Sequence, residues 1–261
     1  MLVKTRPALR RVRVLGVEFF AGSLDEAVDF IADGGLLTAP SGIGMAADLV
    51  REPAYRRALG VSDLVLTDSG LLVTLWQLRT GQRLPRHSGL KFLRRWFERP
   101  EMHVPGTACW VMPSEGDAER ARVWLNSMGV PAAPEDFHVA PWYGAGEICD
   151  EKLLAHLEAR RPALVYLGIG GGVQERLGCH LREQLTYRPT ILCLGAALAF
   201  LTGAQVRIPP WVDRARLGWL WRVVSHPRRF AGRYFRALRL VWLVMRYGRA
   251  APPLKVSTCA G

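Results

Sequence analysis

The stretch that most constrains the fold is residues 163–177, ALVYLGIGGGVQERL. Its four apolar residues at 164–167 are typical of a short buried strand, and a polar helix is predicted to begin at Val173. Between strand and helix stand Gly168, Gly170, Gly171 and Gly172. Such a junction lets the backbone approach a ligand closely, with free N–H groups at the helix start for an anion such as a diphosphate. The other interpretation is a tight turn whose glycines only pack, and this stretch alone leaves both open.

The rest of the chain alternates short apolar runs with amphipathic segments. Strands alternating with helices predict an α/β fold: a Rossmann-like, mainly parallel sheet with helices on both faces. In such sheets ligands bind beyond the carboxyl ends of the strands. The predicted strands are 12–20, 36–38, 63–67, 108–112, 137–140, 164–167 and 190–194, and the predicted helices are 24–32, capped by Ser23, then 45–59, 71–78, 90–99, 116–128 and 147–160.

Charge divides the chain into two parts. From Gln205 to the end there are twelve Lys or Arg residues and one acid, so this piece carries +11 of the total net charge of +12. We therefore expect an α/β domain over residues 1–210 and a basic, amphipathic, helical appendage over 211–261. A near-neutral body with a cationic piece implies an anionic partner for that piece.

The appendage interleaves arginines with large apolar residues, most clearly over residues 230–247. This pattern is typical of a helix lying in a membrane interface, and we favour association with a membrane surface. The alternative is a terminal helix docked on the domain with a solvated arginine face. Nucleic acid is not an expected partner, because no recognisable binding module accompanies the charge. No apolar run reaches the ~18 residues that span a bilayer, and the basic N-terminus has no signal-peptide cleavage site.

Three predicted strand ends carry polar or glycine-rich turns, at 38–41, 68–70 and 168–175. Asp68 ends a buried strand and opens a helix, so its carboxylate is a candidate general base. It is equally a candidate helix N-cap.

Other polar residues have two interpretations each. Gln174 and Glu175 follow the glycines and either bind a ribose or sugar or simply complement the helix dipole. Arg207 precedes a rigid Pro-Pro-Trp segment and could face a phosphate. His87 and His226 are predicted to lie in surface loops, and the five scattered cysteines are predicted to be free thiols. No metal site is expected. The glycine loop also fails as a dinucleotide fingerprint, because Val173 replaces its third glycine and no acid follows about 20 residues on.

Four segments, in order, resemble the N-acetylmannosaminyltransferase-type glycosyltransferases of family 26, which act in teichoic-acid, enterobacterial common antigen and exopolysaccharide synthesis. The resemblance covers residues 36–234. Its segments are VSDLVLTDSGLLVTL, RLPRHSGLKFL, LVYLGIGGGVQERL and the run from LGAALAFLTG to HPRRFAGRY.

The resemblance implies an inverting, metal-independent transferase without a cofactor. It would move a sugar from a UDP-sugar to a polyprenyl-diphosphate-linked saccharide at the cytoplasmic face of the bacterial inner membrane, as a peripheral protein. A homo-oligomer is allowed. The resemblance implies that Asp68 is the catalytic base. Residues implied to bind the sugar donor are Thr38, Ser41, Gly168, Gly170, Gln174, Glu175 and Arg207; those implied to bind the acceptor or the diphosphate are Arg86, Arg222, Arg229 and Arg233.

The chain departs from the family pattern at Pro40, Lys91, Gly172 and Gly218. These changes touch the expected sugar-donor site, so glucose or another hexose is allowed as well as an N-acetylhexosamine. The alternative function is a non-catalytic, membrane-associated relative that acts as a partner in polysaccharide assembly.

Overall fold

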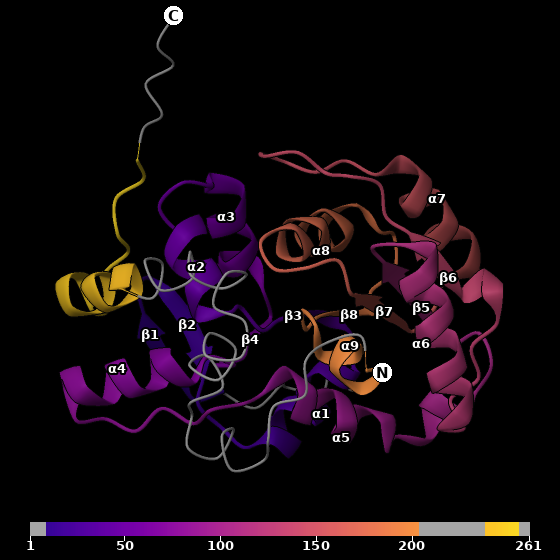
Figure 1. The fold of residues 1–261 in the computed structure, drawn as a ribbon, viewed down its shortest axis with the longest axis horizontal. Helices are drawn as coiled ribbons and strands as arrows, with labels where there is room; N and C mark the ends of the chain where they lie inside the picture. Colours follow the sequence, from indigo (N-terminus) through magenta and orange to yellow (C-terminus); the bar gives the residue numbers. More distant parts are fainter. Residues whose placement is uncertain (1–8, 204–237, 256–261) are drawn as a thin grey trace, which may run out of the picture.

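The computed structural model describes residues 9–203 and 238–255, and it is built around a parallel sheet (Figure 1). Six parallel strands pair in the order β4-β3-β8-β7-β5-β6. The α/β class with a Rossmann-like sheet is therefore confirmed. The strands are β3 (Gly35–Thr38), β4 (Leu64–Val65), β5 (Ala108–Met112), β6 (Phe137–Val139), β7 (Leu164–Leu167) and β8 (Thr190–Cys193).

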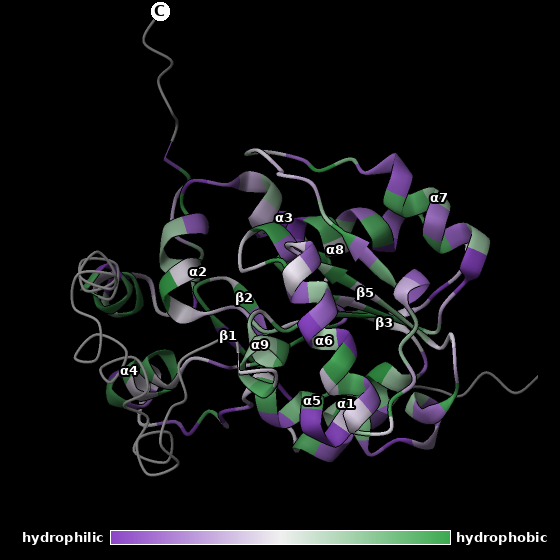
Figure 2. Ribbon diagram, turned by 45° about the vertical axis from the view of Figure 1, so that its right-hand side comes forward, coloured by the Kyte–Doolittle hydropathy of each residue, from purple (hydrophilic) through white to green (hydrophobic). Residues whose placement is uncertain are grey.

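Helices cover both faces of this sheet, as the alternation of strands and helices predicts. Successive side chains of a strand point to opposite faces, so Leu37 packs in one core and its neighbour Leu36 in another. The first core holds α1 (Leu24–Ala32), α5 (Gly89–Phe97), α6 (Glu115–Ser127) and α9 (Ala197–Leu201); the second holds α7 (Glu151–Arg160) and α8 (Val173–Gln184). Figure 2 shows the helices with their hydrophobic sides turned inward. Short 3-10 turns occur at η1 (Pro100–His103) and η2 (Pro134–Asp136).

Local sequence signals explain where most helices begin. Ser23 caps α1 in a capping box with Glu26, as predicted. Ser114 and Asp150 are the N-caps of α6 and α7, and the side chain of each accepts the backbone N–H of the residue three positions on. The cap at Asp150 means that α7 begins four residues later than the predicted start at 147.

The strand predicted over 63–67 is shorter in the structure, where β4 covers only Leu64–Val65. Two further predicted elements are each divided in two. The strand predicted over 12–20 is a hairpin of β1 (Arg11–Val14) and β2 (Val17–Phe20), because Leu15 and Gly16 both have positive φ and form its turn. The helix predicted over 45–59 is two helices, α2 (Gly42–Asp48) and α3 (Pro53–Val61). Pro53 lacks the N–H that would continue the first helix, and it starts the second instead.

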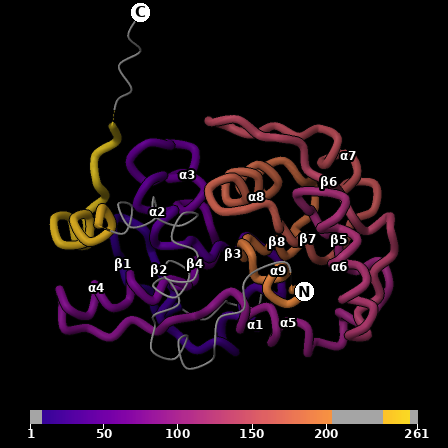
Figure 3. The backbone as a smooth tube through the Cα atoms, viewed as in Figure 1, coloured from indigo at the N-terminus to yellow at the C-terminus, as the bar shows by residue number. Residues whose placement is uncertain are grey.

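A third core lies beside β4 and joins segments far apart in the sequence. It packs the hairpin, α2, α4 (Gly70–Thr80) and a helix over residues 238–247. Figure 3 shows this last helix beside α4 and the hairpin. The backbone N–H groups of Leu15 and Gly16 donate to the carbonyls of Gly248 and Arg249 at 2.8 and 3.0 Å. Residues 238–255 thus pack on the body, although the sequence assigns them to the appendage; residues 204–237 lie outside the described residues.

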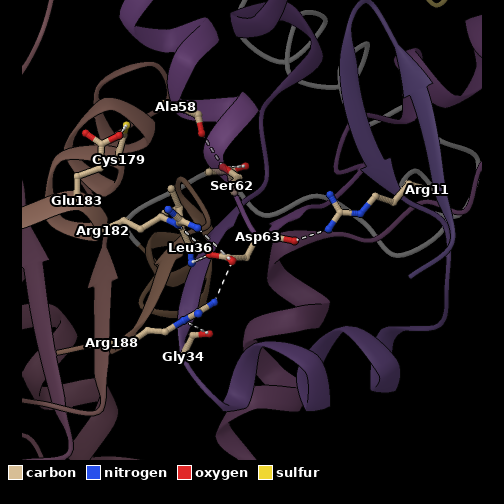
Figure 4. A network of polar contacts seen from close by, with 11 residues as sticks. Arg11, Gly34, Leu36, Ala58, Ser62, Asp63, Cys179, Arg182, Glu183 and Arg188 are labelled. Carbon is tan, nitrogen blue, oxygen red and sulfur yellow. Dashed lines mark hydrogen bonds and ion pairs between the residues drawn. The ribbon is translucent and has the colours of Figure 1, made fainter. Parts of the chain in front are cut away.

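Asp63 directly precedes β4 and holds several elements together at the amino-terminal end of the parallel strands (Figure 4). Its carboxylate accepts hydrogen bonds from Arg182 and Arg188 at 3.0 and 2.9 Å and from the Leu36 N–H at 2.9 Å. Burial opposes ionisation, but these partners, Arg182 first, hold the pKa of Asp63 below its usual value. The carbonyl of Asp63 accepts from Arg11 at 2.9 Å. This network ties α8, β3, β4 and the hairpin together and leaves the other end of the sheet for the site.

Among the described residues, none of the helices has both the length and the apolar character needed to cross a membrane. Cys109, Cys149, Cys179 and Cys193 are free thiols, as predicted.

Candidate functional site

The candidate site lies where the six parallel strands end. Because all six run the same way, the segments that follow β3, β4, β7 and β8 emerge at one edge. Backbone bonds hold them in register: the Ala39 N–H donates to the Cys193 carbonyl at 3.0 Å, and the Leu66 N–H donates to the Thr38 carbonyl at 2.8 Å. The turns singled out at 38–41, 68–70 and 168–175 therefore meet at this edge.

Asp68 stands at the end of β4, partly exposed. Its Oδ1 accepts the Gly89 N–H at 3.1 Å, and its carbonyl accepts Nε of Arg86 at 3.0 Å. Ser69 caps α4, since its hydroxyl accepts the Leu72 N–H at 3.2 Å. The alternative in which Asp68 is the N-cap is therefore wrong. The structure brings Asp68, Arg86 and Gly89 together, as the shared motifs imply.

The loop that carries Arg86 folds back on the end of β4. The His87 N–H donates to the Thr67 carbonyl at 3.0 Å, and Nε2 of His87 lies 2.8 Å from the Gly22 carbonyl. His87 is 8% exposed, so the prediction of a surface-loop histidine is wrong. Burial lowers its pKa, which favours the neutral ring. The buried ring anchors the loop beside Asp68.

Thr38 and Ser41 lie at the end of β3 in different settings. Thr38 is fully buried, and its hydroxyl donates to that of Ser62 at 3.2 Å. In this conformation the Thr38 side chain stabilises the end of β3 from inside the protein and is not exposed at the candidate site. Ser41 is exposed and caps α2, accepting the Gly44 N–H at 3.1 Å. Its neighbour Gly42 has no room for a side chain, since a Cβ there would lie 2.4 Å from the Ser69 hydroxyl. The ends of β3 and β4 are therefore in direct contact.

Gln174 and Glu175 are almost completely buried behind the glycine loop, at 1% and 0% exposure. Oε1 of Gln174 accepts the Gly195 N–H at 2.9 Å, and its Nε2 donates to Glu175 at 3.1 Å. The other oxygen of Glu175 accepts the Gly172 N–H at 2.6 Å. Two neighbouring side chains thus join the loops after β7 and β8 into one unit. Gln174 and Glu175 therefore affect the edge of the sheet by holding the backbone of these two loops in place.

The Glu175 carboxyl has an unusual environment. Burial is the main cause that raises its pKa to about 7, and the nearby Asp48 carboxylate acts in the same direction. Tyr55, buried beneath it, has a pKa raised well above its usual value by burial first and then by Glu175. Perturbed groups of this kind gather at functional sites.

Arg176 completes the first turn of α8 and reaches a further loop. Its Nε donates to the Gly172 carbonyl at 3.1 Å, and its Nη1 donates to the Gly144 carbonyl at 2.9 Å and to that of Gly146 at 2.5 Å. The Gly146 N–H in turn donates to the Glu52 carboxylate at 3.1 Å. The segment after β6 is therefore fixed to the glycine loop and to the corner between α2 and α3.

Comparison with known protein families gives one match. The model of the glycosyl transferase WecG/TagA/CpsF family matches residues 12–252, which is nearly the whole chain. The chain belongs to this family. Membership places it among the glycosyltransferases of cell-envelope polysaccharide synthesis, and the suspected family 26 relationship is confirmed. No curated protein sequence matches the chain.

In this WecG/TagA/CpsF glycosyltransferase, several expected site residues lie outside the described residues: Arg207, Arg222, Arg229 and Arg233. Of the positions that depart from the family pattern, Pro40 is buried after β3, Lys91 is exposed on α5, and Gly172 forms part of the site. Gly218 also lies outside the described residues.

The sequence interpretation missed Asp48, Arg176 and Gly195. Arg176 directly follows the Gln-Glu pair, so its place in the first helical turn was a usable signal. The sequence holds no comparable signal for Asp48, because only the folded position of α2 brings this residue next to the glycine loop.

Proposed function

We propose that this glycosyltransferase moves a hexose or an N-acetylhexosamine from a UDP-sugar to a polyprenyl-diphosphate-linked saccharide, with inversion and without a metal or cofactor. The observation that carries the proposal is the placement of Asp68. Its carboxylate stands at the carboxyl edge of a parallel sheet, next to Arg86 and at the same edge as the glycine loop.

The reaction needs one base and one means of stabilising the leaving group. Asp68 takes the proton of the acceptor hydroxyl as that oxygen attacks C1 of the sugar. The bond from C1 to the diphosphate oxygen breaks, and UDP leaves as an anion. Arginines neutralise the developing charge. Arg86 is the candidate at the described edge, and Arg207, Arg222, Arg229 and Arg233 are candidates from the basic segment.

The Gln174–Glu175 pair has a positioning role in this proposal. It fixes the backbone of the loops after β7 and β8, so that the wall of the sugar-donor site is formed before the donor arrives. A preformed wall favours catalysis because the cost of ordering is not incurred at the reaction step.

A panel of UDP-sugars tests the function directly. One member is expected to protect the protein against thermal unfolding, because a ligand at about 100 times its Kd stabilises by about 2.7 kcal/mol. For a chain of this size that raises Tm by about 5 °C or more. Differential scanning calorimetry with UDP-glucose, UDP-N-acetylglucosamine, UDP-N-acetylmannosamine and UDP gives the comparison. Binding of none of them would favour the non-catalytic relative.

The proposal also places the protein at the cytoplasmic face of the inner membrane, where the lipid-linked acceptor lies. The helix over 238–247 supports this, because it is apolar on two sides. Leu240, Leu243 and Val244 are buried, whereas Leu238 and Trp242 are 65% and 57% exposed. Met245 extends the exposed stripe, and Leu78 of α4 is 73% exposed. Exposed apolar residues beside arginines are typical of a membrane-facing surface.

Replacing Leu238, Trp242 and Met245 together by Ser is expected to reduce binding to vesicles that contain anionic phospholipid by at least tenfold. The reason is the loss of apolar area available to the lipid, each large side chain contributing roughly 1.5–3 kcal/mol when fully buried. Co-sedimentation measures the bound fraction. The matched control is Val123→Ser with Met128→Ser, at two other positions with 58% and 57% exposure. Equal loss in both variants would contradict a specific membrane-facing stripe.

A further inference from the structure

Gly172 is enclosed by charged side chains on three sides. Its N–H donates to Glu175 at 2.6 Å, and its carbonyl accepts from Arg176 at 3.1 Å. On the third side lies Asp48, since a Cβ at Gly172 would be 2.9 Å from Oδ2 of that carboxylate. Gly172 has φ +87°, which an L side chain rarely adopts. Only glycine therefore fits this cradle without strain.

The cradle changes how the start of α8 meets a ligand. A helix N-terminus attracts anions through its unpaired N–H groups and its partial positive charge. Here the fully buried carboxyl of Glu175 already occupies that place. Among the described residues, the guanidinium of Arg176 donates its hydrogen bonds to backbone carbonyls and not to the Glu175 carboxyl. A second anion at this helix end would face both Glu175 and Asp48.

The outer part of the same loop is open. A side chain at Gly170 or Gly171 would meet no heavy atom within 4 Å, so a ligand can approach this backbone. Peptide groups and a carboxylate such as that of Asp48 pair well with hydroxyl groups, which both donate and accept.

We propose that the diphosphate of the sugar donor does not bind at the start of α8, where the Glu175 side chain already lies, and that the glycine loop with Asp48 holds an uncharged, hydroxyl-bearing part of the donor instead. The diphosphate then lies towards the β4 end of the edge, on the side of Arg86. This inference rests on the proposed function. Glu175 is a positioning residue and Asp48 a binding residue in this assignment.

The titratable groups that interact with Glu175 come from three elements: Asp48 of α2, Tyr55 of α3 and Cys193 of β8. Burial first, and Glu175 after it, raise the pKa values of Tyr55 and Cys193 well above their usual values, so both stay neutral near pH 8. At that pH the Glu175 carboxyl is mostly ionised. Its charge then opposes any phosphate placed beside it.

Calorimetry at pH 8 with UDP and with uridine shows whether the diphosphate lies at the start of α8 or on the side of Arg86. Glu175→Gln keeps the shape of the side chain and an oxygen that accepts from Gly172, but it removes the charge. Under the proposal, the affinities for UDP and uridine change by the same factor, within threefold. A gain of tenfold or more for UDP, with uridine unchanged, would place the diphosphate at the start of α8 and overturn the proposal.

Two further variants complete the test. Asp48→Asn is expected to weaken UDP and uridine alike, by threefold or more, because a neutral amide is a poorer acceptor for hydroxyls than a carboxylate. An Asp48→Asn protein that binds both ligands as tightly as the wild type would contradict the assignment of Asp48. Glu183→Gln, in the last turn of the same helix, is the control and should change neither affinity. Failure of the wild-type protein to bind either ligand would overturn the proposed function, and this inference with it.

Discussion

Asp68→Asn is expected to lower the rate of sugar transfer to a lipid-linked acceptor by 100-fold or more. General base catalysis contributes typically 10²–10⁴-fold, and an amide cannot take the acceptor proton at neutral pH. The fold should persist, because an Asn Oδ1 can still accept the Gly89 N–H that Asp68 accepts at 3.1 Å. Transfer of a radiolabelled sugar, with thermal unfolding measured alongside, gives both readings.

The control for this experiment is Asp29→Asn. Asp29 is an exposed acid on α1, and its Oδ1 lies 4.0 Å from Nη1 of Arg99. Its loss is expected to leave both rate and stability unchanged. Full activity of the Asp68→Asn protein would show that Asp68 is not the base. If the Asp68→Asn protein does not fold, Asp68→Glu, which keeps a carboxylate, is tested in its place.

The second large effect concerns the helix over 238–247. Leu243→Ala is expected to lower the free energy of unfolding by about 2–5 kcal/mol. Leu243 is 1% exposed, and it belongs to the same core as Val14, Trp76 and Tyr55. Removing its side chain leaves a cavity that the hairpin, α2 and α4 can fill only in part. Urea unfolding followed by tryptophan fluorescence measures the change.

Leu238→Ala is the matched control, on the same helix and with the same change of side chain. At 65% exposure it is expected to alter stability by at most about 0.5 kcal/mol. A chain that ends near residue 212 should lose at least as much stability as Leu243→Ala, because it also loses the bonds from Leu15 and Gly16 to residues 248 and 249. An unchanged unfolding midpoint in Leu243→Ala would show that this helix is not part of the cooperative core.

Much of the fold could be predicted because its signals are local. The apolar runs at 108–112 and 164–167 have the length of buried strands, and Ser23 stands directly before an amphipathic segment, where an N-cap is expected. The errors are local as well. A turn at Leu15–Gly16 divides the nine residues predicted as one strand, and the residues predicted as one helix are divided at Pro53. Each residue was visible in the sequence, but the surrounding apolar pattern outweighed it.

The candidate site could be predicted only in outline. The motifs around Asp68, Arg86 and the glycine loop pointed to one edge, since parallel strands end on the same side. Which side chains line that edge was a different matter. Gln174 and Glu175 have the composition of ligand-binding residues, yet their side chains turn inward and hold Gly195 and Gly172.

The sequence by itself determined the class of fold, the edge that carries the site and membership of the glycosyltransferase family, because strand length, turn residues and ordered motifs are written along the chain. Only the tertiary structure decided that residues 238–255 belong to the body, that Ser69 caps α4 in place of Asp68, and that Asp48 and Glu175 flank Gly172. The packing of residues 238–255 and the place of Asp48 depend on contacts between segments distant in sequence. Ser69 rather than Asp68 caps the helix because Asp68 accepts its hydrogen bond from Gly89, 21 residues further along the chain. A local sequence pattern does not show which residues such contacts bury. Burial in turn shifts the pKa of a titratable side chain and decides which groups that side chain can contact.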